Sequence, residues 1–162
     1  MEMDGGLLSA IEHSSFGVAA RETPWIYPAA NVGHILTLTV FAAAVAMMDA
    51  RLLGALQSIA PGVFLRSVRY VAAGALLLML ATGSVLFTAE ATHVAFNPVF
   101  QIKIALIGLA LLNALLFEMF AAEKVRAWPA NLLLPPLARV SAALSLGLWF
   151  CVAAAGRLIA YF

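Results

Sequence analysis

Two side chains that can bind a metal lie within apolar stretches of this sequence, His34 and Lys103. Residues 28–48 carry no charge, and His34 lies six residues after Pro28, where that stretch begins. Lys103 lies five residues after Pro98, which precedes another apolar stretch. An ionisable group within a membrane-spanning segment is rare, and by default it is a functional hypothesis. If both stretches are helices that start at the same membrane face, the imidazole and the amine lie at a similar depth.

A histidine and a lysine that face each other from two helices could be the two axial ligands of a haem. Lysine can bind iron only as the neutral amine. Ala110 and Ala114 continue the Lys103 face of the helix, and such small residues leave room for a flat macrocycle or for a neighbouring helix. Because the chain has a single cysteine, Cys151, and no CxxCH motif, any haem would be held by coordination alone, as haem b is.

Both residues also have simpler interpretations. A lysine close to a helix end can extend to the membrane interface and have no other role. A histidine between helices can form a hydrogen bond to a neighbour, here Asn31 or Thr37. His93 lies in a polar connection, where an unliganded histidine is expected.

Composition indicates a membrane protein. The 162 residues are 64% hydrophobic and 10% charged, and the mean hydropathy is +1.01. Soluble domains are about a quarter charged, which excludes an ordinary soluble fold. The formal net charge of +1 gives no basic surface for nucleic acid.

Four apolar stretches predict four spans that form one all-α domain over residues 1–162, an integral membrane four-helix bundle. Pro61 and Gly62 are expected to end any helix that starts at Leu52. In the last span, small residues recur every four positions and predict a packing seam. The predicted spans are residues 28–48, 70–88, 99–122 and 140–156, and the seam consists of Ala143, Gly147, Cys151 and Ala155.

A short amphipathic helix is predicted ahead of the first span, over residues 6–22. Leu7, Ile11 and Val18 recur there at helical spacing, whereas Glu12 lies away from them. Such a helix lies in the membrane interface.

The distribution of basic residues predicts the orientation. Six basic residues lie in the connections after the first and third spans, and three lie on the other side, so both termini are expected to face outward. The six are Arg51, Arg66, Arg69, Lys124, Arg126 and Arg139, and the three are Arg21, Lys103 and Arg157. Glu118, near the inner end of the third span, is expected to pair with a cation such as Arg51 or Arg139.

Several stretches carry a resemblance to known proteins. AAREtPWIYPaaNvgHILtL, DARLLG, FNPvFQIKiALigLALLNALLFE and LWFcvAAAGRLIAYF resemble an uncharacterised bacterial family of four-helix membrane proteins. More distantly, the early histidine, the arginine at the far end of that helix and the lysine of the third helix are similar to those of HemJ-type protoporphyrinogen oxidases and CopD-like membrane proteins. On the HemJ pattern His34 and Lys103 match the haem-binding pair, and Arg51 matches the arginine. HemJ-type enzymes have a further histidine late in the third helix, where this chain has Asn113 and Glu118.

The expected function is that of a haem b protein of a bacterial inner membrane, with both termini periplasmic. It would transfer electrons or oxidise a hydrophobic substrate such as a quinol or a porphyrinogen, with His34 and Lys103 as ligands. Arg21 and Arg157, both on the outer side, are expected to bind the haem propionates.

Two alternatives stay open. One is a copper-handling protein that uses His13, His34 and His93, because three imidazoles suit copper. The other is a homo-oligomer or a structural subunit of a larger membrane complex, which needs no site.

Overall fold

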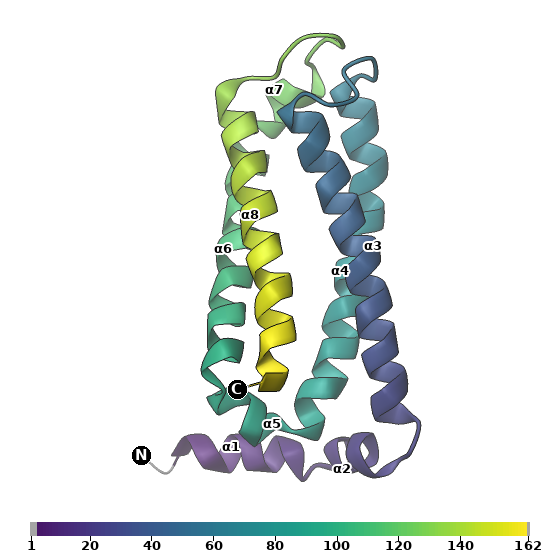
Figure 1. The fold of residues 1–162 in the computed structure, drawn as a ribbon, viewed down its shortest axis with the longest axis vertical. Helices are drawn as coiled ribbons and strands as arrows, with labels where there is room; N and C mark the ends of the chain where they lie inside the picture. The colour runs from purple at the N-terminus through teal and green to yellow at the C-terminus, as the bar shows by residue number, and fades with distance from the viewer. Residues whose placement is uncertain (1–2, 162) are drawn as a thin grey trace.

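The computed structural model describes residues 3–161, and the regular secondary structure in this range is helical. Four long helices run side by side (Figure 1), and each is long and apolar enough to cross a membrane. The predicted all-α membrane bundle is therefore confirmed. The four helices are α3 (Ile26–Leu53), α4 (Pro61–Ala89), α6 (Pro98–Phe120) and α8 (Pro136–Leu158). Residues 1, 2 and 162, the ends of the predicted domain, lie outside the described range.

The remaining helices are short and lie at the two ends of the bundle. α1 (Met3–Glu12) and α2 (Ser15–Glu22) lie across one end, roughly perpendicular to the long helices, together with α5 (Ala91–Phe96) (Figure 1). α7 (Ala122–Arg126) lies at the opposite end, and a 3₁₀ turn, η1 (Ile159–Tyr161), follows α8.

The predicted interfacial helix is two helices. The Ser14 hydroxyl accepts a hydrogen bond from the Gly17 amide at 3.1 Å, which caps the start of α2 and ends α1 at Glu12. Gly17 is required at this corner, because a Cβ there would lie 2.8 Å from the Ile11 carbonyl oxygen. The exposed Trp25 ring stands between α2 and α3, where an aromatic side chain at the headgroup level is expected.

The prediction for Pro61 and Gly62 was wrong. α3 continues to Leu53 and ends because Gly54 adopts a left-handed conformation with φ of 112°. Pro61 occupies the first turn of α4, a position where its missing N–H costs nothing. Gly62 then lies directly against the backbone of Arg126 in α7, an approach that a side chain would prevent.

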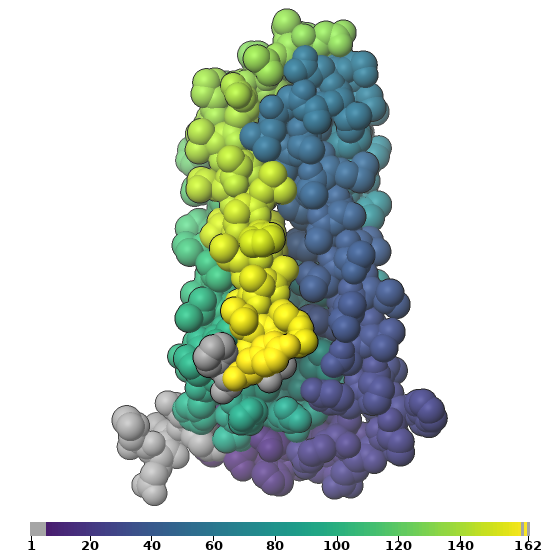
Figure 2. Space-filling model, in the orientation of Figure 1, coloured from purple at the N-terminus to yellow at the C-terminus, as the bar shows by residue number. Residues whose placement is uncertain are grey.

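The long helices pack as two pairs, α3 with α4 and α6 with α8, and the pairs meet through α3 and α8. Figure 2 shows α8, in yellow, lying along α3, in blue. Phe41 of α3 meets Trp149 of α8 edge to face, with ring centroids 4.6 Å apart. Small residues such as Ala44 and Ala72 let α3 and α4 approach closely. Most large apolar side chains of α6 point away from the bundle, as expected of a helix in contact with lipid.

The predicted seam of small residues in α8 does not pack within the chain. Ala155 is buried, whereas Ala143, Gly147 and Cys151 are exposed. A Cβ added at Gly147 would have no atom within 4 Å. This face of α8 therefore points out of the bundle.

Candidate functional site

His34 lies in α3 with its ring turned toward α4. Its Nδ1 is 3.1 Å from the Thr82 hydroxyl oxygen, and that hydroxyl donates its own proton to the Leu78 carbonyl oxygen at 2.8 Å. With the Thr82 hydroxyl proton directed to Leu78, the Thr82 oxygen faces Nδ1 as an acceptor, an arrangement that suits the tautomer protonated at Nδ1. This leaves the Nε2 lone pair free to bind a metal. A hydrogen bond from one ring nitrogen that fixes the tautomer for the other is typical of histidine ligands.

Gly83 gives the ring its space. A Cβ at Gly83 would lie 3.1 Å from Cε1 and 3.5 Å from Nδ1 of His34. The glycine thus allows the imidazole to lie flat against the backbone of α4. Among the described residues the side chain that pairs with the His34 ring is Thr82, and not Asn31 or Thr37 as predicted; the Thr37 hydroxyl donates instead to the backbone carbonyl oxygens of Gly33 and His34.

Lys103 reaches from α6 to α8, again over a glycine. A Cβ at Gly156 would lie 3.5 Å from the Lys103 Nζ and 3.7 Å from its Cε. The amine therefore lies against the backbone of α8 within the bundle, and it is within electrostatic range of the His34 imidazole. The structure thus places the two predicted ligands in one region, on opposite helix pairs.

The Phe41–Trp149 contact lies deeper in the bundle than this region. Phe41 follows His34 by seven residues, and Trp149 precedes Gly156 by seven. At 1.5 Å per residue, both aromatic rings lie about 10 Å further from the α1–α2 end. The region around His34 and Lys103 therefore lies between this aromatic contact and the end of the bundle across which α1 and α2 lie.

The two arginines predicted to bind propionates already have partners. Arg21 donates from Nη1 to the Ala89 carbonyl oxygen at 3.1 Å and lies 3.9 Å from the Glu12 carboxylate. Arg157 donates to the Tyr161 hydroxyl at 2.7 Å and lies over its ring. Both occupy the end of the bundle nearer to His34 and Lys103, and both side chains are exposed.

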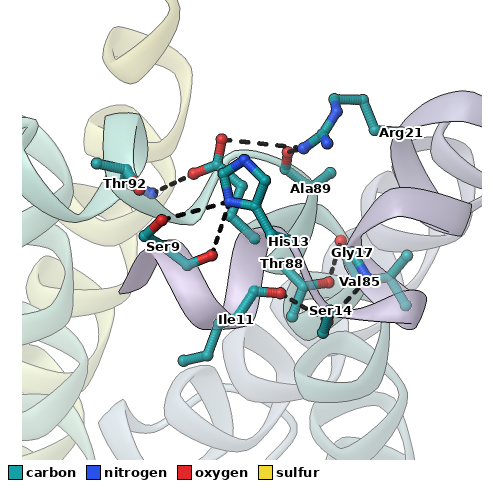
Figure 3. A network of polar contacts seen from close by, with 11 residues as sticks. Ser9, Ile11, His13, Ser14, Gly17, Arg21, Val85, Thr88, Ala89 and Thr92 are labelled. Atoms are coloured by element: carbon teal, nitrogen blue, oxygen red, sulfur yellow. Dashed lines mark hydrogen bonds and ion pairs between the residues drawn. The ribbon is translucent and has the colours of Figure 1, made fainter. Parts of the chain in front are cut away.

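The three histidines are not brought together. His13 folds back onto the Ser9 carbonyl oxygen at 2.8 Å (Figure 3), and His93 is exposed on α5 rather than in an irregular connection. Within residues 3–161 no three histidine, cysteine, aspartate or glutamate side chains form a group that could hold a metal ion.

The Glu12 side chain links α1 to α5. Its carboxylate accepts from the Thr92 amide at 2.9 Å (Figure 3), and this hydrogen bond, with Arg21 nearby, holds the Glu12 pKa below its usual range. Together with the Arg21–Ala89 hydrogen bond, it docks α1 and α2 onto the end of the bundle.

Glu118 pairs with cations, as predicted, but its partners are not Arg51 or Arg139. Its carboxylate pairs with Arg69, at 2.7 Å, and with Arg126. Arg51 is completely buried and donates from Nε and Nη2 to the Ile59 carbonyl oxygen, at 3.0 and 2.8 Å, which closes the connection between α3 and α4. The Asn113 Nδ2 donates to the Ser141 carbonyl oxygen, and the Asn113 Oδ1 accepts from the Ser141 hydroxyl. This position therefore links α6 to α8.

Sequence reasoning missed Thr82, Gly83 and Gly156. The second predicted span has no charged residue that would mark it, yet it supplies the hydrogen bond and the space that orient His34. A threonine followed by a glycine within an uncharged span was the available signal.

Comparison of the chain with protein-family models, with curated proteins and with solved structures gave no match. The function is therefore argued from the residues of the chain itself.

Proposed function

We propose that this protein binds haem b between its two helix pairs, with His34 and Lys103 as axial ligands, and that it transfers electrons or oxidises a hydrophobic substrate such as a quinol or a porphyrinogen. The observation that carries the proposal is the His34–Thr82 hydrogen bond, because it suits the tautomer in which Nε2 has a free lone pair, and it orients the ring. The Lys103 amine, on the opposite pair, supplies a second nitrogen in the same region.

The donor set fits a low-spin haem. A bound haem supplies one-electron chemistry, and the protein sets its potential through the ligands and the dielectric. His34 would hold the iron through Nε2 while Thr82 keeps the ring from turning. Lys103 must give up a proton to bind, and its position among apolar helices favours the neutral amine over the ammonium ion. Arg21 and Arg157 could bind propionates only by exchanging their present partners.

The proposal includes an orientation with both termini outside the cytoplasm, in a bacterial inner membrane. It is supported by the excess of basic residues at the α7 end of the bundle. A reporter that is active only in the cytoplasm should be silent when fused to the C-terminus and active when inserted between α3 and α4. The reverse pattern would move the candidate site to the cytoplasmic half.

The test is the optical spectrum of the full chain, purified from cells supplied with ample haem. A Soret band is expected. His34→Ala should abolish the Soret band or leave a weak band of a high-spin form. His93→Ala is the control, because His93 is exposed at the same end of the bundle, and it should leave the Soret band unchanged. Lys103→Met should retain the haem with a changed spectrum and a higher potential, because thioether ligation raises the potential. Lys124→Met is the matched control for loss of a lysine.

The two ligands are separable by experiment. Acidification should protonate the Lys103 amine and give a reversible five-coordinate spectrum that Lys103→Met lacks. A Lys103→Met protein with the wild-type spectrum at every pH would remove the lysine ligand and direct attention to His93 or His13. Wild-type protein that carries no haem after expression with ample haem would refute the proposal, and copper found in it would favour the copper-handling alternative.

One observation favours a second candidate, a structural subunit of a homo-oligomer or a larger membrane complex. Ala143, Gly147 and Cys151 leave a flat outward face on α8. Helices in lipid associate through faces of this kind. A protein without haem that migrates as an oligomer, and becomes monomeric on Gly147→Leu, would support this candidate.

A further inference from the structure

A cleft of about 700 Å³ opens at the end of the bundle opposite α1 and α2. Its walls are the first turns of α4, the last turn of α6 and α7. Three arginines, a tyrosine and a serine line it beside apolar residues. The polar lining residues are Arg66, Arg69, Arg126, Tyr70 and Ser67.

The cleft is positively charged. Glu118 lies at its edge and is shared by Arg69 and Arg126, so one carboxylate faces two guanidinium groups. Arg66 adds a third cation, and the four side chains together carry a net charge of +2. A guanidinium has five N–H donors. Arg69 and Arg126 therefore keep donors that the Glu118 carboxylate does not use. About half of each of these two side chains is exposed, at 42% and 51%.

The cleft also lies at the level where the membrane changes from hydrocarbon to headgroups. α4 has 29 residues, about 43 Å of helix, whereas the hydrocarbon core is about 30 Å thick. Its uncharged segment begins at Tyr70, directly after Arg69. The arginines of α4 therefore stand at the depth of lipid phosphate groups. On the hydrocarbon side of Arg69, α4 continues with the exposed side chains of Tyr70, which lines the cleft, and Val71.

We propose that this cleft binds the headgroup of an anionic phospholipid, with the phosphate against Arg66, Arg69 and Arg126 and the acyl chains along the outward faces of α4 and α6. Basic pockets between spanning helices are suited to such headgroups, and arginine binds phosphate oxygens through two donors at once. Glu118 has a positioning role, because it holds two of the arginines side by side.

The test is native mass spectrometry of the full chain in detergent, with phosphatidylglycerol or phosphatidylcholine of identical acyl chains added. Wild-type protein should retain phosphatidylglycerol preferentially. Arg66→Gln/Arg126→Gln should reduce that retention by about ten-fold, since two charge-assisted hydrogen-bonding groups are lost. Arg139→Gln removes one positive charge at the same end of the bundle but outside the cleft. It is the matched control for Arg66→Gln alone, and it should change retention less than two-fold.

Thermal unfolding in detergent checks that the double variant folds. If it does not, Arg66→Gln alone, which removes the arginine that does not contact Glu118, should still reduce retention about three-fold. Equal retention of the two lipids by wild type would overturn the proposal. An equal loss in Arg139→Gln would overturn it too, because that result indicates general attraction to the basic end. Glycerol 3-phosphate or inorganic phosphate binding as tightly as the lipid would assign the cleft to free phosphate instead.

Discussion

A methyl group added at Gly83 tests the position of His34 whether or not a cofactor is bound. In Gly83→Ala the new Cβ would lie 3.1 Å from the His34 Cε1, several tenths of an ångström inside the usual carbon contact of about 3.5–4.0 Å. The ring must turn away, and an off-rotamer side chain costs about 0.5–1.5 kcal/mol. The hydrogen bond to Thr82 is weakened at the same time, for which about 0.5–1.5 kcal/mol is a typical net contribution.

Gly74→Ala is the matched control, because it makes the same change in the same helix with no atom within 4 Å of the new Cβ. Replacing glycine at an unstrained position stabilises a protein by about 0.4–1 kcal/mol, through the lower entropy of the unfolded chain. Both variants share that gain, so the free energy of unfolding of Gly83→Ala should lie about 1–3 kcal/mol below that of Gly74→Ala, the sum of the two costs at the His34 ring.

The measurement is reversible unfolding of the full chain in mixed detergent micelles. In a His34→Ala background the difference between the two alanine variants should disappear, because the ring that resists the methyl group is gone. If Gly83→Ala is as stabilising as Gly74→Ala in the wild-type background, the His34 ring does not lie against α4 and the assignment of its tautomer fails.

Three further predictions follow from the same structure. The lowered pKa of Glu12 means that its hydrogen bond to Thr92 stabilises the folded chain at neutral pH and is lost as the pH falls through the folded-state pKa. The protection of α1 amides, corrected for the intrinsic exchange rate at each pH, should therefore fall on acidification in wild type but not in Glu12→Gln. Thr82→Val should weaken haem binding about 10- to 100-fold with an altered spectrum, whereas Thr39→Val, which loses only a hydrogen bond within α3, should not; equal effects would contradict the role of Thr82. Gly147→Leu should leave the free energy of unfolding of the monomer within about 0.5 kcal/mol of wild type, and a larger loss would show that this face packs inside the bundle.

The spans could be predicted because each is an uncharged apolar stretch, and lipid imposes a helix on such a stretch. Their ends were less predictable. Pro61 can end one helix or begin the next. In the structure it begins α4, and Gly62 then contacts the backbone of α7, a contact that the local sequence does not show. The break at Ser14 was equally hard to predict. A serine can cap the start of a new helix, as Ser14 does for α2, but it is also an ordinary residue on the polar face of one continuous helix.

The candidate site was predictable in its residue types but not in its supporting contacts. His34 and Lys103 stand out because ionisable groups are rare in spans. Thr82 lies 48 residues from its partner, so only the way α3 packs against α4 brings the two together. Glu118 shows the same limit, because five arginines lie at that end and only the placement of α4 and α7 brings Arg69 and Arg126 to the carboxylate.

The docking of α1 and α2 has a consequence for how the chain is assembled during synthesis. Their anchors are the Ala89 carbonyl oxygen and the Thr92 amide, which follow Arg21 and Glu12 by 68 and 80 residues. At the usual translation rates of about 5–20 residues per second, these anchors emerge roughly 3–16 s after the N-terminal helices. During that interval α1 and α2 lack both anchors, although α3 and the first turns of α4 are already made. The final contacts of α1 and α2 with the bundle are therefore completed only after the α3–α4 hairpin has been synthesised.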